Sequence, residues 1–138
     1  MTVSERFDRL EYVVKLIAVT ERRVQAYRDT LCASSAPFDT ERVTHSRNMD
    51  AMGEKVSAVV DAERDLSSLK EELAELQTTA MYWIGLLTDP QEIQMMTMRY
   101  IEGKQNDVIA MESGVGVRRV QMIIREAKNN IEKNLNFA

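Results

Sequence analysis

The chain is poor in the residues that build sheets, disulfides and catalytic clusters. Its 138 residues include 5 glycines, 2 prolines, 1 cysteine and 1 histidine, and aromatic residues make up 6%. So few turn residues disfavour a many-stranded sandwich or barrel. The single cysteine excludes an internal disulfide and a thiolate metal site, and is typical of a reducing cytoplasm. The single histidine excludes catalytic schemes that need two imidazoles.

Several sequence signals are missing as well. No run of 18 apolar residues is present, so we expect no membrane span. The N-terminal segment reaches the charged residues Glu5 and Arg6 at once, which disfavours a signal peptide. The chain has no phosphate-binding glycine loop, nucleophile motif or metal-ligand spacing. We therefore expect a cytoplasmic protein that is not an enzyme and has no cofactor and no metal.

The abundant residues favour helices, and the charges are unevenly placed. Leucine, methionine, alanine, glutamate and arginine are good helix formers, so the sequence predicts an all-α fold. The formal net charge is −4. Residues 1–89 hold 11 basic and 16 acidic side chains, whereas residues 116–138 hold 5 basic and 2 acidic ones. This excess of positive charge at one end indicates where an anionic partner would bind.

Apolar residues recur at seven-residue intervals along the first two thirds of the chain. The first series runs from Val3 to Leu31, and Ser4 can cap the start of that helix. Residues 32–47, with Pro37, are typical of a polar connection. A second series over 48–87 spans five heptads with charged flanks, the pattern of a coiled coil. Its apolar seam consists of Met52, Val59, Ala62, Leu66, Leu69, Leu73, Leu76, Ala80, Trp83 and Leu87.

Two partners can cover this seam. The first helix can fold back onto it, and a second copy of the chain can pack against it. We expect the first helix to be too short to cover a helix over 48–87, which would be about 60 Å long at 1.5 Å per residue. We therefore expect both: the first helix folds back antiparallel onto the seam, and a homo-oligomer assembles through residues 48–87.

A clear helix start follows at Asp89. Asp89 can cap the helix, Pro90 fits its first position and Glu92 can complete a capping box. The pattern predicts one helix from there to Gly103, a short helix over 105–113 and a last helix from Gly116. We thus expect a helical hairpin or coiled coil for oligomerisation over 1–88 and a compact helix-turn-helix head over 89–138.

The spacing of small and apolar residues over 109–120 is typical of a helix-turn-helix. Ala110 lets two helices cross closely, and Gly114 can take the positive φ at the end of the first one. Val115 and Val120 would fill the angle between the helices. The expected buried set of the last helix is Val120, Ile123, Ile124, Ala127 and Ile131. Its outer surface would carry Val117, Arg118, Arg119, Gln121, Met122, Arg125 and Lys128.

That outer surface suits double-stranded DNA. Arginine can pair bidentately with guanine and glutamine with adenine in the major groove. Lys104 and Lys128 are expected to contact backbone phosphates, which positions a protein without reading sequence. We therefore expect double-stranded DNA as the partner of this surface.

The C-terminal segments resemble region 4 of sigma-70-type factors, in which a similar helix precedes the DNA-reading pair. Gly116 departs from that pattern, since Ser or Thr usually caps the recognition helix, and Gln105 follows Lys104 where an acidic or aromatic residue is usual. The matching segments are Leu87-Thr-Asp-Pro-Gln-Glu-Ile, Met98-Arg-Tyr-Ile-Glu-Gly, Gly114-Val-Gly, Arg119-Val-Gln and Glu126-Ala-Lys.

The wider range 40–137 resembles a family of small proteins from phages and prophages of Gram-positive bacteria. Val43-Thr-His-Ser and Asp50-Ala-Met carry the N-terminal part of this resemblance. The nearest described relatives are phage late-transcription regulators of the ArpU and RinA type. The resemblance implies a sequence-specific DNA-binding transcriptional regulator of phage or prophage type in a bacterial cytoplasm, with host RNA polymerase as a further partner.

Two other functions fit the same pattern. A phage small terminase subunit, which takes part in DNA packaging, also pairs a helix-turn-helix with a coiled coil and binds DNA. A coiled-coil interaction module would instead use its head to bind a protein of the transcription machinery. Salt-dependent binding to duplex DNA separates the DNA-binding functions from the interaction module.

Overall fold

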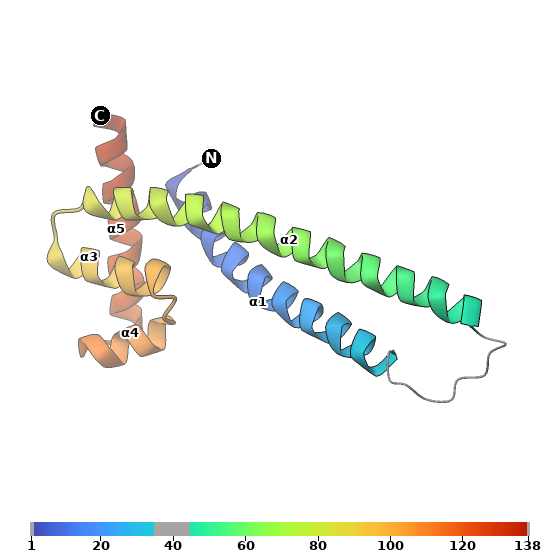
Figure 1. Ribbon diagram of the computed structural model, residues 1–138. Helices are drawn as coiled ribbons and strands as arrows, with labels where there is room; N and C mark the ends of the chain where they lie inside the picture. The colour runs from blue at the N-terminus through green and yellow to red at the C-terminus, as the bar shows by residue number, and fades with distance from the viewer. Residues whose placement is uncertain (1, 35–44, 138) are drawn as a thin grey trace. The chain divides into compact units, whose positions relative to one another are not determined.

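A computed structural model describes residues 2–34 and 45–137, and every regular element in these ranges is a helix (Figure 1). The fold is therefore all-α, as the sequence predicts. No described helix combines the length and apolar character that crossing a membrane requires. The elements are α1 (Val3–Ser34), α2 (His45–Gly85), α3 (Pro90–Met96), the π-helical turn η2 (Thr97–Ile101), α4 (Asn106–Ser113) and α5 (Val117–Phe137).

Helix α1 begins with a capping box at Thr2, whereas the sequence pattern predicts a cap at Ser4. The Thr2 hydroxyl accepts a hydrogen bond from the backbone N–H of Glu5 at 3.2 Å, and the Glu5 carboxylate accepts one from the Thr2 N–H at 3.0 Å. Thr2, rather than Ser4, is the cap, because the Thr-x-x-Glu spacing satisfies two N–H groups at once. At its other end α1 continues to Ser34, and α2 begins at His45. The rest of the expected connection, 35–44, lies outside the described residues.

The chain divides into two compact units. The head unit comprises Met1–Val14 and Glu72–Ala138, and the hairpin unit comprises Lys15–Glu71. The boundary expected between residues 88 and 89 lies inside the head unit. The reason is that the first turns of α1 and the last turns of α2 supply apolar side chains to the core of the C-terminal helices.

The hairpin unit is an antiparallel pair of helices. Glu21 forms an ion pair with Lys70, and Arg28 forms one with Glu63. The second pair lies seven residues later than the first on α1 and seven residues earlier on α2, as antiparallel helices require. Thr20 also lies in the buried face, where its hydroxyl donates to the Leu16 carbonyl at 2.7 Å. The buried apolar side chains of this unit are Ile17, Val24, Val59 and Ala62.

The apolar seam of α2 is covered within one chain. All ten seam residues, from Met52 to Leu87, are buried or half-buried. The expected fold-back of the first helix is confirmed, because α1 has 32 residues and its apolar stripe follows the seam in both units, which leaves six of the ten seam side chains half-buried. Oligomerisation through residues 48–87 stays a prediction, but an uncovered seam no longer supports it.

The core of the head unit gathers side chains from both ends of the chain. Phe7 of α1 is 1% exposed, and its ring lies 5.8 Å from the Trp83 ring and 4.5 Å from the Tyr100 ring. The sequence pattern predicts one helix up to Gly103, but the chain forms a π-helical turn at Thr97–Ile101. This wider turn allows both Met98 and Tyr100 to be buried.

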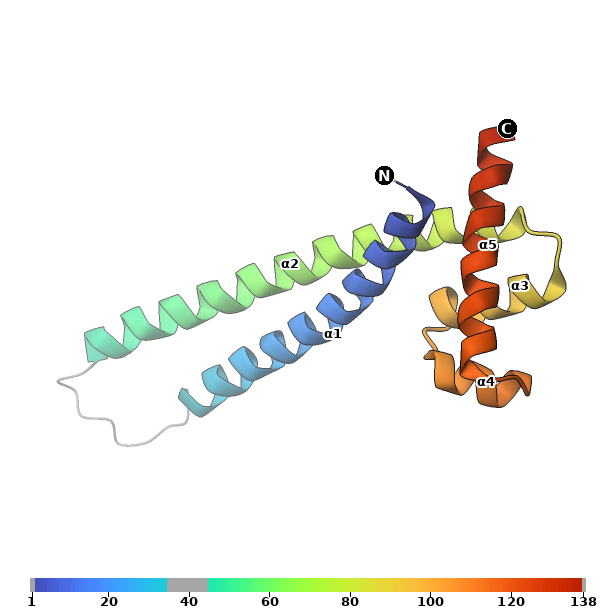
Figure 2. The ribbon, with the colours of Figure 1, turned by 180° about the vertical axis from the view of Figure 1, so that it is seen from behind.

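Helix α5 packs across α3 and α4, as both views show (Figure 1, Figure 2). Asp89 caps α3 by accepting from the Gln91 N–H at 3.0 Å, as predicted. Glu92 does not complete a capping box. Its buried carboxylate instead accepts from the Asn130 amide of α5 at 2.9 Å. This bond ties the start of α3 to α5.

The burial of Phe7 predicts a large effect on stability. Phe7→Ala should lower the free energy of unfolding by about 3–5 kcal/mol, because it opens a cavity between two aromatic rings. Urea denaturation followed by circular dichroism measures this. Tyr82→Ala is the matched control, since that ring is 65% exposed and should cost less than about 0.5 kcal/mol. Equal effects of the two substitutions would contradict the packing of α1 into the head core.

Candidate nucleic-acid interface

The turn between α4 and α5 has the geometry that the sequence predicts. Gly114 ends α4 with a left-handed φ of 71°, and its N–H donates to the Ala110 carbonyl. The Val115 N–H donates to the same carbonyl at 3.1 Å. Helix α5 then starts at Val117, and the Gly116 carbonyl accepts its first hydrogen bond, from the Val120 N–H at 3.1 Å. Gly116 therefore occupies the capping position.

Packing between the two helices also agrees with the prediction. Ala110 is buried at their crossing, Val120 is fully buried and Val115 is partly buried against the same cluster. The whole expected buried face of α5 lies in the core: Val120, Ile123, Ile124, Ala127 and Ile131. The opposite face of α5 is consequently fixed toward solvent.

Three predicted contact residues form a stripe on that exposed face. Arg118, Met122 and Arg125 are spaced four and three residues apart, so they lie along one side of the helix. Arg119 and Gln121 flank the stripe on its two sides, and Val117 lies at the N-terminal end. All six side chains are exposed.

The arginines of this face are not paired. Arg118, Arg119 and Arg125 form no ion pair within the described residues. By contrast, Arg9 and Arg28 are bonded to Glu72 and Glu63. Three guanidinium groups on one helix are thus open to an anionic partner.

Lys104 differs from these arginines because its charge is already engaged. Its Nζ lies 2.7 Å from a Glu112 carboxylate oxygen and 3.6 Å from one of Glu102. The hydrogen bond to Glu112 raises the pKa of Lys104 above its usual value. A phosphate contact by Lys104 would have to displace these carboxylates.

Lys128 does not share the exposed face with the other predicted residues. It is half-buried, and its Nζ lies 5.2 Å from the centre of the Tyr100 ring and 5.9 Å from that of Phe7. Burial lowers the pKa of Lys128 below its usual value. The expectation of an outward-facing lysine fails because helical spacing turns residue 128 toward α1 and η2.

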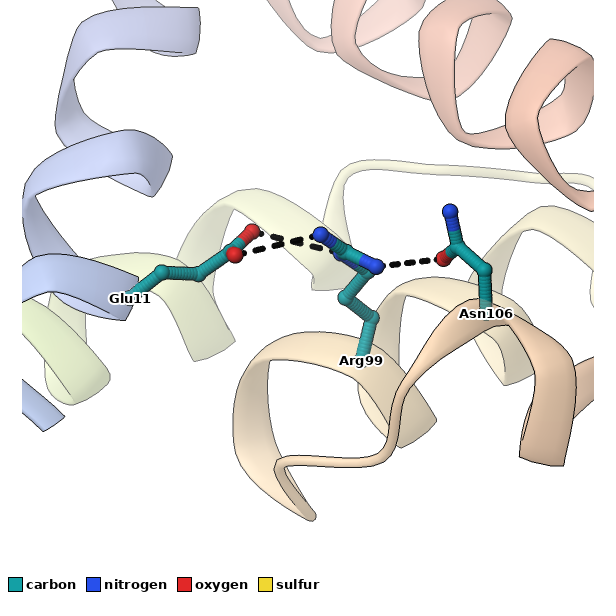
Figure 3. A network of polar contacts seen from close by, with 3 residues as sticks. All are labelled: Glu11, Arg99 and Asn106. Atoms are coloured by element: carbon teal, nitrogen blue, oxygen red, sulfur yellow. Dashed lines mark hydrogen bonds and ion pairs between the residues drawn. The ribbon is translucent and has the colours of Figure 1, made fainter. Parts of the chain in front are cut away.

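A half-buried polar network adjoins this region. The guanidinium of Arg99 donates two hydrogen bonds to the Glu11 carboxylate, at 3.2 and 3.1 Å, and a third to the side-chain oxygen of Asn106 (Figure 3). Arg99 thereby connects α1 with Asn106, the first residue of α4. The sequence interpretation did not assign these roles. The only available signal was the Arg-Tyr-Ile-Glu-Gly segment itself.

The described residues give no indication of a metal site. They contain no group of three or more histidine, cysteine, aspartate or glutamate side chains that could hold a metal ion. No family model, curated protein or solved structure matches the chain. The function proposed for this chain therefore rests on the geometry of the head unit.

The two glycines of the turn predict opposite responses to substitution. Gly114→Ala should destabilise the head by about 1–2 kcal/mol, because a side chain at positive φ is strained even where space is free. Gly116→Ser should be neutral or stabilising by a few tenths of a kcal/mol, since no positive φ applies there and serine caps helices well. Thermal unfolding of both variants measures the difference. Equal losses would contradict the assigned turn.

Alkaline pH should destabilise the head unit through Tyr100. Burial raises the pKa of its phenol, so the folded head favours the neutral form. The unfolded phenol ionises near pH 10, so this stabilisation is complete below about pH 10 and is lost as the pH rises further. Urea denaturation between about pH 8 and 11 should show a falling free energy of unfolding that is less steep in Tyr100→Phe. The same slope in both proteins would contradict the assignment.

Proposed function

We propose that the protein is a sequence-specific DNA-binding protein whose head unit places α5 in the major groove. The observation that carries this proposal is the row of unpaired arginines on the exposed face of the second helix of a helix-turn-helix. The major groove is wide enough to admit an α-helix. In helix-turn-helix proteins the N-terminal residues of the second helix contact base edges.

The chemistry of this face suits base reading. Arg118 and Arg119 lie in the first turn of α5, and Gln121 and Arg125 follow within two turns. Guanidinium and amide groups form bidentate pairs with guanine and adenine, each worth about 1–3 kcal/mol of discrimination. Val117 and Met122 offer apolar contact with thymine methyl groups. Helix α5 carries five basic and two acidic side chains, so it attracts the backbone as well.

Within this proposal the role is that of a transcriptional regulator of phage or prophage type, which the resemblance to region 4 of sigma factors suggests. Assembly of two chains through residues 48–87 would present two heads to two half-sites one helical turn apart. Val19, Val56 and Val60 are exposed on the hairpin unit and provide apolar surface for such assembly. Light scattering tests it directly, and the mass of a single chain would contradict it.

One observation favours a second candidate function, binding to a protein. Met111 of α4 is 84% exposed and the neighbouring Val108 is 38% exposed. Apolar side chains at this level of exposure suit a protein surface better than a phosphate backbone. Such a partner would be a component of the transcription machinery, with host RNA polymerase as the first to test.

The arginine face predicts the outcome of a double substitution. Arg118→Ala with Arg119→Ala should abolish duplex binding and leave helix content unchanged, because both side chains are exposed and unpaired. Fluorescence anisotropy with duplexes selected from a random pool measures binding. Lys133→Ala is the matched control, since it removes a positive charge from an exposed position of the same helix.

Salt dependence provides a second readout of the same complex. If a dimer neutralises about six phosphates, affinity should fall about a thousandfold between 50 and 200 mM salt. Unchanged binding by the double variant would contradict the proposal. No duplex binding by the parent protein at 50 mM salt would leave the head as a protein-interaction module.

A further inference from the structure

The head unit contains a polar cleft of about 310 Å³ on one flank of α5. It is formed by the N-terminal part of α1, η2, the start of α4 and the side of α5 that faces them. This volume lies at the lower end of the range for small-molecule sites. The polar side chains that matter for its chemistry are Ser4, Asp8, Asn106, Gln121, Arg125 and Lys128.

Lys128 is a half-buried cation in this cleft. Its ammonium group is half-buried over two aromatic rings and forms no ion pair with any described carboxylate. Asp8 and Glu11 favour its charged form only from beyond ion-pair distance, so part of the cost of burying the charge remains, and a bound anion would offset it. The contacts with Tyr100 and Phe7 hold the ammonium in place without neutralising it.

The groups around Lys128 add hydrogen-bond donors and contribute little negative charge. Arg125 has no ion-pair partner among the described residues and lines the same cleft. The side-chain oxygen of Asn106 accepts from Arg99, which leaves its amide nitrogen as a donor (Figure 3). Glu11 is occupied by the same arginine. Asp8 is the remaining carboxylate, so two cations face one anion.

We propose that this cleft binds a phosphate group. A phosphate monoester offers three strong acceptor oxygens and up to two charges, and a backbone phosphodiester offers two such oxygens and one charge; in both, the tetrahedral oxygens suit an ammonium, a guanidinium and an amide donor together. A carboxylate has only two oxygens in one plane. The group belongs either to the backbone of a bound duplex or to a small phosphorylated compound, and only the first source rests on the function proposed above.

A phosphate bound in the cleft would affect the exposed face of α5. Gln121 and Arg125 line the cleft and also belong to the face proposed to read bases. A free phosphate compound in the cleft would engage these side chains and compete with the duplex. A duplex phosphate in the cleft would instead fix the register of α5 in the groove.

The first experimental arm uses inorganic phosphate without DNA. Phosphate should raise the melting temperature of the protein above that measured in sodium chloride of equal ionic strength, because a ligand of the folded state stabilises it. Lys128→Gln should lose this excess, Lys128→Arg should keep it, and Lys133→Gln serves as the control for net charge. Circular dichroism checks that each variant folds. If Lys128→Gln is unfolded, Arg125→Gln takes its place.

The second arm distinguishes the two sources of phosphate. Selected duplexes are made with single methylphosphonate substitutions, which remove the charge of one phosphate at a time. At one position, the substitution should weaken duplex binding by the parent protein at least tenfold and leave binding by Lys128→Gln unchanged. That result would show that the cleft binds a phosphate of the duplex. If no position does so while the first arm is positive, the site belongs to a free phosphate compound.

The outcomes separate this inference from the proposed function. In one outcome, the protein binds no duplex, yet phosphate still raises its melting temperature in a way that depends on Lys128. That result supports phosphate binding in the cleft and contradicts the DNA-binding proposal. Alternatively, duplex binding depends on Arg118 and Arg119, and Lys128→Gln and Lys133→Gln respond equally in both arms. That result overturns the proposal that the cleft binds phosphate. In that case Lys128 serves only to cover the Phe7 and Tyr100 rings.

Discussion

Phe7 packs against Trp83 and Tyr100, and the geometry of the head depends on this contact. The three rings join the first helix of the chain to the end of the second and to the π-helical turn. Since Phe7 is almost fully buried, the C-terminal helices do not complete their core without the N-terminal turns. The Glu11–Arg99 ion pair, which joins residues 88 positions apart, follows from the same packing.

This packing also decides which charges remain available to a partner. Arg99 is held between Glu11 and Asn106, Lys104 lies between two glutamates, and Lys128 is drawn over the aromatic rings. The basic groups near the core are thus engaged or half-buried, whereas the arginines of the α5 face have no ion-pair partner in the part of the chain that the structure describes. Three cations of the head that form no ion pair within the described residues thus lie together on the exposed face of α5. Such an arrangement favours a directional contact over a diffuse electrostatic one.

The features that sequence could predict are those set by local chemistry. Seven-residue periodicity gave α1 and α2, Asp89 and Pro90 marked α3, and Gly114 marked the turn before α5, because each depends on neighbours within one or two helical turns. The positions of Lys104 and Lys128, the bond between Glu92 and α5, and the entry of α1 into the head depend on contacts between distant segments. Periodicity carries no information on such contacts.

Contact between the exposed face of α5 and duplex DNA is what the proposed function requires. Nuclear magnetic resonance of the isotopically labelled full chain, titrated with a selected duplex, tests it most directly. The largest chemical-shift changes should fall on residues 117–125 and on the arginine side chains of that helix, with small changes over 52–71. Changes confined to the exposed apolar residues of α4, or no changes at 50 mM salt, would contradict it.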